Sequence, residues 1–481
     1  MSPAVTAVSS ASNHADGGGA PTTTSRDRLS ARELCAYGTG IVAYQYPHYG
    51  LAQLAMPLFN VTLGVAPAQV GAVLMLGRIW DAALNPLVGT WSDNTRSRWG
   101  RRRPWLVAGA VLSGLAYPLV WLAPRGWSGD ALSLWLLGSC LLLYTAFAAF
   151  SVPYMALGLE LTPDTRERTR VQAWRTYFNL IPIFTAGWFY WFCQRPIFGD
   201  ALTGARWLGL IVGLAILGTG VIPGLLLRER YYRVAASAGR EPFWPAAFAA
   251  LRNRPFLLVM GIIVTLSIGQ QTTEALGFYV FAYHIYGGDT MAAARLVGVS
   301  AVVTMLSAFV AIPVVRAGER RWGKLGALRG CLWAYLAIAL AKWWLATPQF
   351  PWLSLLIGVF SQFGTLGFWM IVNSMKADVC DDDELASGRR REGIYGSLGN
   401  LLSKVASSSV FLLAGLVLQL IGFDAVRGVQ DPTTIVWLRV VYSGGPIFFL
   451  VLCLLMLDRY PLDERAMDVT RRTLEQRRSA V

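Results

Sequence analysis

The sequence has few charged residues for its length. Charged residues make up 15% of its 481 residues, whereas a soluble domain has roughly 25%. Hydrophobic residues make up 54% and are arranged in long runs. This composition argues against an ordinary soluble domain and indicates a chain that crosses the membrane several times.

Cysteine and histidine are also scarce. The six cysteines include no CxxC pair, and the three histidines, His14, His48 and His284, do not have the spacing of a metal site. No nucleophile motif is present either, so neither a cofactor nor an enzymatic activity is predicted. A membrane enzyme is therefore the weakest of the functional alternatives.

Acidic residues are outnumbered by basic ones. The chain has 42 Lys and Arg against 28 Asp and Glu, which gives a formal net charge of +14. A soluble protein with this charge would be a candidate for nucleic-acid binding. Here the basic residues gather in short loops between apolar runs, without the aromatic-interleaved patches of a nucleic-acid interface. The predicted partners are therefore membrane lipids and a small-molecule substrate, with no nucleic acid, and a monomer is expected.

Long apolar segments begin after residue 33. Residues 1–33 have no apolar core and are predicted to be a disordered cytoplasmic tail. Segments long enough to cross about 30 Å of hydrocarbon follow. The predicted spans are 34–59, 69–91, 104–124, 132–158, 172–193, 205–227, 256–284, 292–316, 325–346, 351–375, 394–421 and 434–457.

The loops differ in basic residues on alternate sides. The second-to-third loop carries five arginines, whereas 60–68, 285–291 and 347–350 carry no Lys or Arg. The positive-inside rule therefore predicts that both termini are cytoplasmic. A multi-pass protein of the plasma membrane, the inner membrane in a bacterium, is expected.

A short motif recurs in the two parts of the chain. Arg98-Trp99-Gly100-Arg101 follows the second span, and Arg321-Trp322-Gly323-Lys324 follows the eighth. This repeat predicts an all-α membrane protein with twelve transmembrane helices in two six-helix halves, which is the major facilitator fold. The predicted parts are the halves 34–227 and 255–457, a cytoplasmic linker at 228–254 and a cytoplasmic tail at 458–481.

The second span carries charge inside the membrane. Arg78, Asp81 and Asn85 have the spacing of one helix face, so Arg78 can pair with Asp81. Ionisable residues inside a membrane are expensive and usually functional. A proton or cation site is predicted here, and a static salt bridge between helices is the alternative.

Several stretches resemble the glycoside–pentoside–hexuronide:cation symporter family. Arg78 to Pro86 resembles its R-x-W-D-A-x-x-D-P pattern, and Ser97 to Trp105 resembles its S-R-W-G-[KR]-x-[KR]-P-W loop. The stretch 378–404 and the tail from Tyr460 are similar as well. The resemblance covers 34–478 and implies coupled transport by alternating access.

The family's working residues are only partly retained. The resemblance implies a coupling role for Asp81, but the second aspartate of the family's cation site is Asn85 here. Its sugar-binding acid and stacking tryptophan in the fourth span are replaced by Ser151 and Met155. The substrate-region residues that the resemblance implies are retained at Arg175, Trp369 and Lys404.

The balance of charge points to the kind of substrate. The candidate cavity keeps the cations Arg78, Arg175 and Lys404, while Asp81 and Glu274 are its remaining candidate acids. Cations suit an anionic or amphipathic substrate, unless helix ends, water or other partners neutralise them.

The predicted function is therefore secondary active transport of a small organic, sugar-derived solute, with an anion as one candidate. Proton symport through Asp81 is favoured over sodium, because sodium prefers several hard oxygen ligands. The alternatives are a facilitator or exporter of amphipathic, lipid-like metabolites and a non-transporting receptor or scaffold.

Charged residues also cluster at the cytoplasmic loops. Such clusters form a gate between the halves in the superfamily, and the bland alternative is topology alone. The predicted gating residues are Asp93, Arg98, Arg101, Asp378, Arg390 and Glu392. Lys342, beside Trp343 and Trp344, is expected to be a snorkelling anchor.

Overall fold

The protein is a bundle of long helices. The computed structural model describes residues 29–162, 164–227, 229, 248, 250–388, 392–425, 427–462 and 464–479. Within these ranges the regular structure is helical, with no strand. The helices are α1 (Ala31–Ala55), η1 (Met56–Thr62), α2 (Pro67–Asn94), α3 (Arg103–Trp121), α4 (Gly129–Glu160), α5 (Thr165–Ala186), α6 (Phe189–Cys193), η2 (Pro196–Phe198), α7 (Ala201–Leu226), α10 (Arg254–Tyr279), η3 (Val280–Ile285), α11 (Thr290–Leu345), η4 (Pro351–Ser354), α12 (Leu355–Ser387), α13 (Glu392–Leu420), α14 (Pro432–Leu457) and α15 (Glu464–Ser479).

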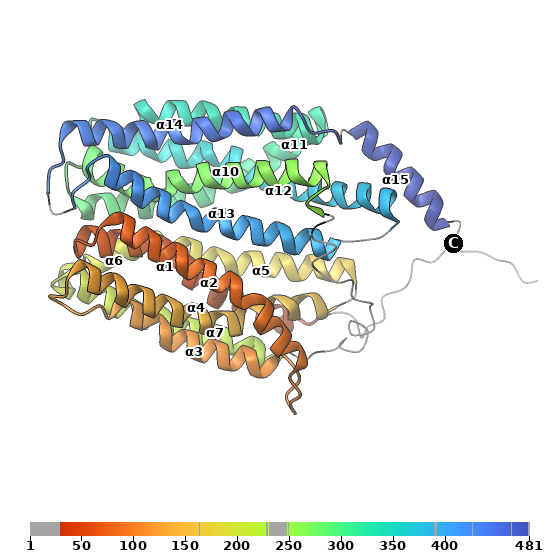
Figure 1. Cartoon of the computed structure of the whole chain (residues 1–481), viewed down its shortest axis with the longest axis horizontal. Helices are drawn as coiled ribbons and strands as arrows, with labels where there is room; N and C mark the ends of the chain where they lie inside the picture. Colours follow the sequence, from red (N-terminus) through yellow and green to blue (C-terminus); the bar gives the residue numbers. More distant parts are fainter. Residues whose placement is uncertain are drawn as a thin grey trace, which may run out of the picture.

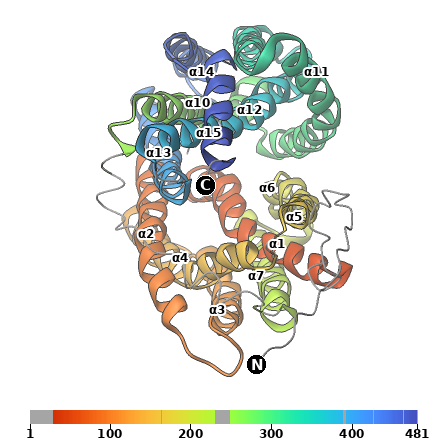
Figure 2. The same ribbon diagram turned by 90° about the vertical axis from the view of Figure 1, so that its right-hand side faces the viewer.

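The long helices run side by side in two groups. Figure 1 shows α1–α7 below and α10–α14 above, with α15 projecting from one end. Figure 2 shows the same two groups end-on. One hydrophobic core is drawn almost entirely from residues 29–227, and two others come from 250–460. The contacts between the groups are mainly α2 with α13 and α5 with α11.

Eight stretches of the described chain are long and apolar enough to cross a membrane. One of them is α11, whose range covers nearly all of two predicted spans and the predicted loop between them. Gly323, at φ 70° and ψ 176°, is not helical, so α11 consists of two helices joined across a kink at this residue. The two parts of α11, before and after Gly323, are called here its first and second rods.

Some predicted helix ends differ from the structure. Helix α12 continues twelve residues beyond the predicted end at 375, which places Asp378 on a helix. Helix α5 begins at Thr165 instead of 172 and ends at Ala186, and α6 follows after a break at Gly187 and Trp188. Hydropathy marks the apolar part of a helix, and these helices continue into water as polar turns.

The two predicted tails are only partly described. The first helix already begins at Ala31, because Ser30 and Glu33 form a capping box around its first turn. At the other end α15 packs on α12, with Met467 and Leu474 buried. Most of the predicted linker 228–254 lies outside the described residues.

Candidate functional site

A charge pair joins the two helix groups. The Lys404 ammonium on α13 donates a hydrogen bond of 2.8 Å to Oδ2 of Asp81 on α2. The Asp81 side chain is 1% exposed and that of Lys404 is 30% exposed. The pair therefore links elements 323 residues apart in sequence, with its acid fully enclosed.

Asn85 completes this arrangement one turn along α2. With its amide oriented to satisfy both hydrogen bonds, its oxygen accepts from Lys404 Nζ at 2.7 Å. Its amide nitrogen then donates to the backbone oxygen of Asp81 at 3.1 Å. The ammonium of Lys404 is thus held between a carboxylate oxygen and an amide oxygen. We call Asp81, Asn85 and Lys404 the central triad.

One carboxylate oxygen of Asp81 takes no part in the hydrogen bonds of the triad. Oδ1 of Asp81 is buried and has no hydrogen-bond partner in the described part of the chain. A buried carboxylate oxygen without a partner is costly, so this atom is a natural acceptor for a proton or a cation.

The pair between Arg78 and Asp81 that helical spacing allows is not formed among the described residues. Among the described residues Asp81 pairs with Lys404 instead, and the Arg78 guanidinium lies 5.8 Å from the centre of the Phe411 ring. Helical spacing predicts neighbours on one helix, but a partner on another helix can be nearer, as Lys404 is here.

The groups meet closely at the end of the bundle opposite α15. Tyr279 donates a hydrogen bond of 2.9 Å to the Asn60 side chain, and both residues are buried. Gln194 donates to Thr290 across the same interface, at 2.9 Å. We call this region the sealed end.

Glycines make the sealed end tight. A Cβ added at Gly71 of α2 would lie 2.2 Å from the Phe411 carbonyl oxygen on α13. A Cβ at Gly415 of α13 would lie 2.2 Å from the Pro67 carbonyl oxygen. Only glycine permits backbones to approach this closely.

Sequence reasoning missed the contribution of the first helix. His48 lies on α1 among aromatic rings, with its centre 4.9 Å from that of Phe147 and 6.2 Å from that of Tyr144. Its Nδ1 is buried without a hydrogen-bond partner in the described chain. His48 is also within electrostatic reach of Arg78 and Lys404. Its place as an ionisable side chain inside an apolar span was the available signal.

The predicted substrate residues are spread over several helices. Arg175 on α5 donates a hydrogen bond of 3.1 Å to Gln172. Arg175 and Asp81 both lie close enough to Tyr44 to interact with it electrostatically. Trp369 on α12 is half-buried with its ring edge-on to that of Phe368.

The other predicted substrate residues differ in exposure. On α4, Ser151 is buried and Met155 is exposed. Glu274 on α10 is exposed and accepts a hydrogen bond of 2.9 Å from Gln270. The structure brings together the central triad, but gives no hydrogen bond or ion pair from the triad to Arg175, Trp369 or Glu274.

The predicted gating residues take part in ion pairs within each group. Arg101 lies 3.0 Å from Glu160 and 3.6 Å from Asp93, and Arg102 also contacts both acids. The matching pair in the other group joins Lys324 to Asp378 at 2.9 Å.

The other predicted gating residues are Arg98, Arg390 and Glu392. Arg98 is exposed. Arg390 lies outside the described residues, and Glu392 begins α13.

The expectation that Lys342 is a snorkelling anchor is wrong. Its side chain is fully buried, donates to the Thr273 hydroxyl at 3.1 Å, and lies 5.0 Å from the centre of the Tyr442 ring. A hydroxyl and an aromatic face replace the water that an interfacial lysine would reach.

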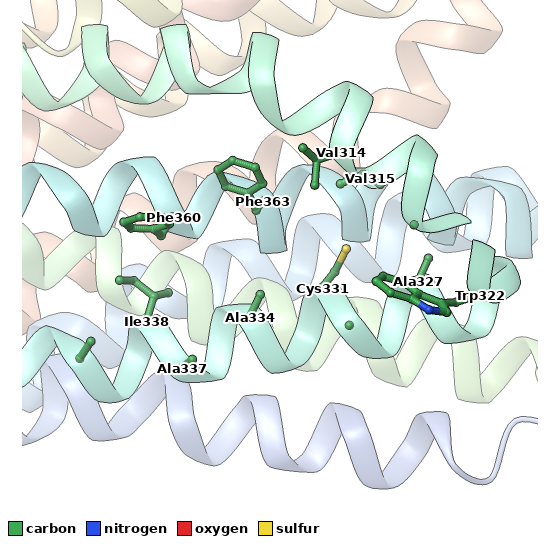
Figure 3. Close-up of a pocket in the computed structure, with 13 residues that line it drawn as sticks. Val314, Val315, Trp322, Ala327, Cys331, Ala334, Ala337, Ile338, Phe360 and Phe363 are labelled. Atoms are coloured by element: carbon green, nitrogen blue, oxygen red, sulfur yellow. The ribbon is translucent and has the colours of Figure 1, made fainter. Parts of the chain in front are cut away.

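Two pockets lie away from the triad. One of about 490 Å³ is at the sealed end and is lined by residues of both groups, including Thr62 and Thr290. The other, of about 690 Å³, is apolar and lies beside α11 and α12 (Figure 3). The described residues contain no cluster of three or more potential metal ligands.

The comparisons with known proteins establish the family. The family model for MFS/sugar transport proteins matches residues 36–464. The chain belongs to this family. It is therefore a multi-pass membrane protein and a secondary active solute transporter, and not an enzyme. The similarity to cation symporters of the melibiose permease type, expected from the sequence motifs, is confirmed.

Two relatives and one solved structure illustrate the range of the likeness. The chain is 24% identical to the sodium-dependent lysophosphatidylcholine symporter 1 of Gallus gallus, over 94% of this chain and 90% of that one. It is also 24% identical to the glucuronide carrier protein homolog of Escherichia coli, over 91% and 94%. The crystal structure of the nucleoside transporter NupG matches with a TM-score of 0.58 at 15% identity, over 89% and 99%. That structural likeness supports the transporter fold.

Proposed function

We propose that the protein carries a small organic anion together with a proton, and that the central triad couples the two. The Lys404 bridge to Asp81 and Asn85 carries this proposal. In this structure Asp81 neutralises the lysine. A proton taken up by Asp81 would release the ammonium, which would then attract an anionic group.

This arrangement makes the two ligands depend on each other. Without the proton, Asp81 competes with the substrate anion for Lys404. Without the anion, protonation of Asp81 leaves a poorly compensated ammonium in the membrane, which is costly. Binding of each ligand therefore favours binding of the other, as thermodynamic linkage requires.

The central triad also lies at the interface between the two helix groups, so that its protonation and ligand binding can influence the movement of one group relative to the other. Asp81 lies on α2 and Lys404 on α13, so the pair spans the interface between the two helix groups. In the proposed twelve-span arrangement these groups are the halves 34–227 and 255–457, which rock about the central site. The ion pairs of Arg101 and Lys324, each within one half, would hold the cytoplasmic loops in shape as the halves move.

The orientation follows the basic loops. Both termini are proposed to lie in the cytoplasm, in the inner membrane of a bacterium. In this orientation the sealed end faces outward.

A proton is the preferred coupling ion. Asp81 supplies a single carboxylate, Asn85 replaces a second one, and Lys404 already occupies the space between them. Sodium needs several hard oxygen ligands, so it would have to displace the ammonium.

A second candidate is sodium-coupled transport of an amphipathic lipid. It is favoured by the likeness to a protein named as a sodium-dependent lysophosphatidylcholine symporter. The first candidate has comparable support from the likeness to a glucuronide carrier homolog. The charged triad favours the first, because an anion satisfies Lys404 directly.

Uptake into proteoliposomes separates these candidates. Phenyl glucuronide and phenyl glucoside differ only in a carboxylate that replaces a hydroxymethyl group, and lysophosphatidylcholine serves as the amphipath. An imposed pH gradient should drive uptake of the glucuronide and not the glucoside. Lys404→Gln should abolish this uptake, whereas the control Lys376→Gln should retain it. Equal uptake of glucuronide and glucoside, or uptake of lysophosphatidylcholine driven by sodium alone, would contradict the proposal.

A further inference from the structure

An apolar groove runs along the outside of the second helix group. Its volume is about 690 Å³, and it lies between the two rods of α11 and the neighbouring α12. Figure 3 shows Phe360 and Ile338 toward one end, Cys331 and Ala334 in the middle, and Trp322 at the other end. The groove is separate from the central triad, none of whose residues lines it.

The shape of the groove suits a hydrocarbon chain. On the second rod of α11, mostly small residues from Ala327 to Ala341 line the groove. This stretch is about 21 Å long at 1.5 Å per residue. One leaflet of the hydrocarbon core is about 15 Å thick, half of the whole core. Gly330 leaves open space, because a Cβ added there would meet no atom within 4 Å.

A cationic side chain lies at one end of this groove. The guanidinium of Arg321 lies 5.9 Å from the centre of the Trp322 ring, and Trp322 itself lines the groove. Arg321 is exposed and makes no ion pair within the described part of the chain. The adjacent Lys324, in contrast, is already paired with Asp378.

We propose that this groove binds an anionic phospholipid, with one acyl chain along the groove and its phosphate at Arg321. Tryptophan is typical of the level where headgroups meet hydrocarbon, and guanidinium groups bind phosphate oxygens well. Apart from Lys324, which is paired with Asp378, the short segment 316–324 holds Arg316, Arg320 and Arg321 against the single acid Glu319. This excess of positive charge favours an anionic headgroup over a zwitterionic one.

The site is independent of the transported substrate. The bound lipid would bridge α12 and the two rods of α11 on either side of the turn at Gly323. Activity would then depend on the lipid composition of the membrane, whatever the substrate is.

Native mass spectrometry of the purified full-length protein tests the site directly. The probe is an equimolar mixture of phosphatidylglycerol and phosphatidylethanolamine with identical acyl chains. The protein should retain phosphatidylglycerol preferentially. Arg321→Gln should reduce this preference about fivefold, the contribution of one basic residue near a lipid headgroup. The control Arg459→Gln, an exposed arginine elsewhere in the same helix group, should leave it unchanged.

Filling the groove tests the acyl-chain part of the proposal. Gly330→Leu should abolish retention of the lipid, and Ala334→Leu should have the same effect. Gly138→Leu is the matched control, because Gly138 is also an exposed helical glycine and a Cβ added there would meet no atom within 4 Å. Excess glycerol 3-phosphate should not displace the lipid, because the headgroup alone lacks the chain.

Three outcomes would overturn the inference. The first is equal retention of both lipids by the unmodified protein. The second is identical lipid binding by Gly330→Leu and Gly138→Leu. The third is displacement by free glycerol 3-phosphate, which would make this a simple phosphate site.

Discussion

The central triad and the sealed end both join the two helix groups, but with opposite chemistry. The contacts between the groups at the sealed end join neutral side chains and backbones, with a buried hydrogen bond from Tyr279 to Asn60 and glycines at close backbone approaches. The triad is charged, partly open at Lys404, and leaves one oxygen of Asp81 without a partner.

This difference assigns each region a different task. Neutral, close-packed contacts hardly respond to a proton or an anion, so the sealed end sets the shape of this state. The charge pair does respond, because a proton on Asp81 or an anion at Lys404 changes the charge that the other residue must neutralise. In the proposed mechanism one interface therefore has two parts: the sealed end, which fixes the conformation, and the charge pair, which responds to the proton and the anion.

The largest effect on stability is expected from breaking the pair on one side. Lys404→Gln leaves Asp81 as an enclosed carboxylate without its cation, which costs about 3–5 kcal/mol for a buried pair. The value should lie near the lower limit, because the lysine side chain is 30% exposed. Thermal unfolding in detergent measures the loss. The double variant Asp81→Asn with Lys404→Gln should recover most of it, and failure to do so would indicate that Lys404 matters through packing alone.

A smaller effect is expected from forcing the sealed end apart. Gly71→Ala places a methyl group against the Phe411 carbonyl oxygen, and such overpacking costs about 1–3 kcal/mol. A cysteine at position 62 in a cysteine-free background should then react faster with a water-soluble maleimide. Gly138→Ala should leave the rate unchanged. Unchanged labelling in Gly71→Ala would show that the backbones separate without cost.

Removing one hydroxyl from the sealed end should have a similar or smaller effect. Tyr279→Phe leaves the Asn60 oxygen buried without its donor, which costs about 1–3 kcal/mol. The same labelling assay should show a modest increase. An increase larger than that of Gly71→Ala would mean that hydrogen bonding, and not close packing, holds this end together.

The smallest effect is expected at Asp200, which lies near the sealed end and whose hydrogen bonds to the described residues stay within its own helix group. Asp200 caps α7, and Arg125 lies beside it. The hydrogen bond from the Thr203 backbone N–H is the main cause that lowers the pKa of Asp200. Its stabilising effect is therefore present above the ordinary aspartate range and is lost as the pH falls through the lowered pKa.

Asp200→Ala should reduce the free energy of unfolding by about 1 kcal/mol, as for a lost N-cap. Thermal unfolding at neutral and acidic pH measures this, and the difference from the unmodified protein should shrink in acid. Faster labelling at position 62 in Asp200→Ala would contradict its separation from the interface.

The sequence predicts the bundle well because hydropathy reports directly on membrane-length helices. It misplaced the ends of α5 and α12, where polar turns extend the helix beyond its apolar part. The motifs predicted Asp81, Asn85 and Lys404 as site residues, and the structure brings these three together, but the spacing suggested Arg78 as the partner of Asp81.

Pairing across helices depends on how the groups pack, which spacing within one helix does not contain. The same limit explains Lys342, whose neighbouring tryptophans indicate an interface although tertiary packing encloses it.

Binding of phenyl glucuronide across a range of pH tests the central claim most directly. Isothermal titration calorimetry on the purified protein should show affinity that rises as the pH falls, because protonation of Asp81 frees Lys404. Asp81→Asn should bind as tightly as the unmodified protein does in acid, with no such dependence on pH. Weaker binding by Asp81→Asn with an unchanged pH dependence would contradict the account.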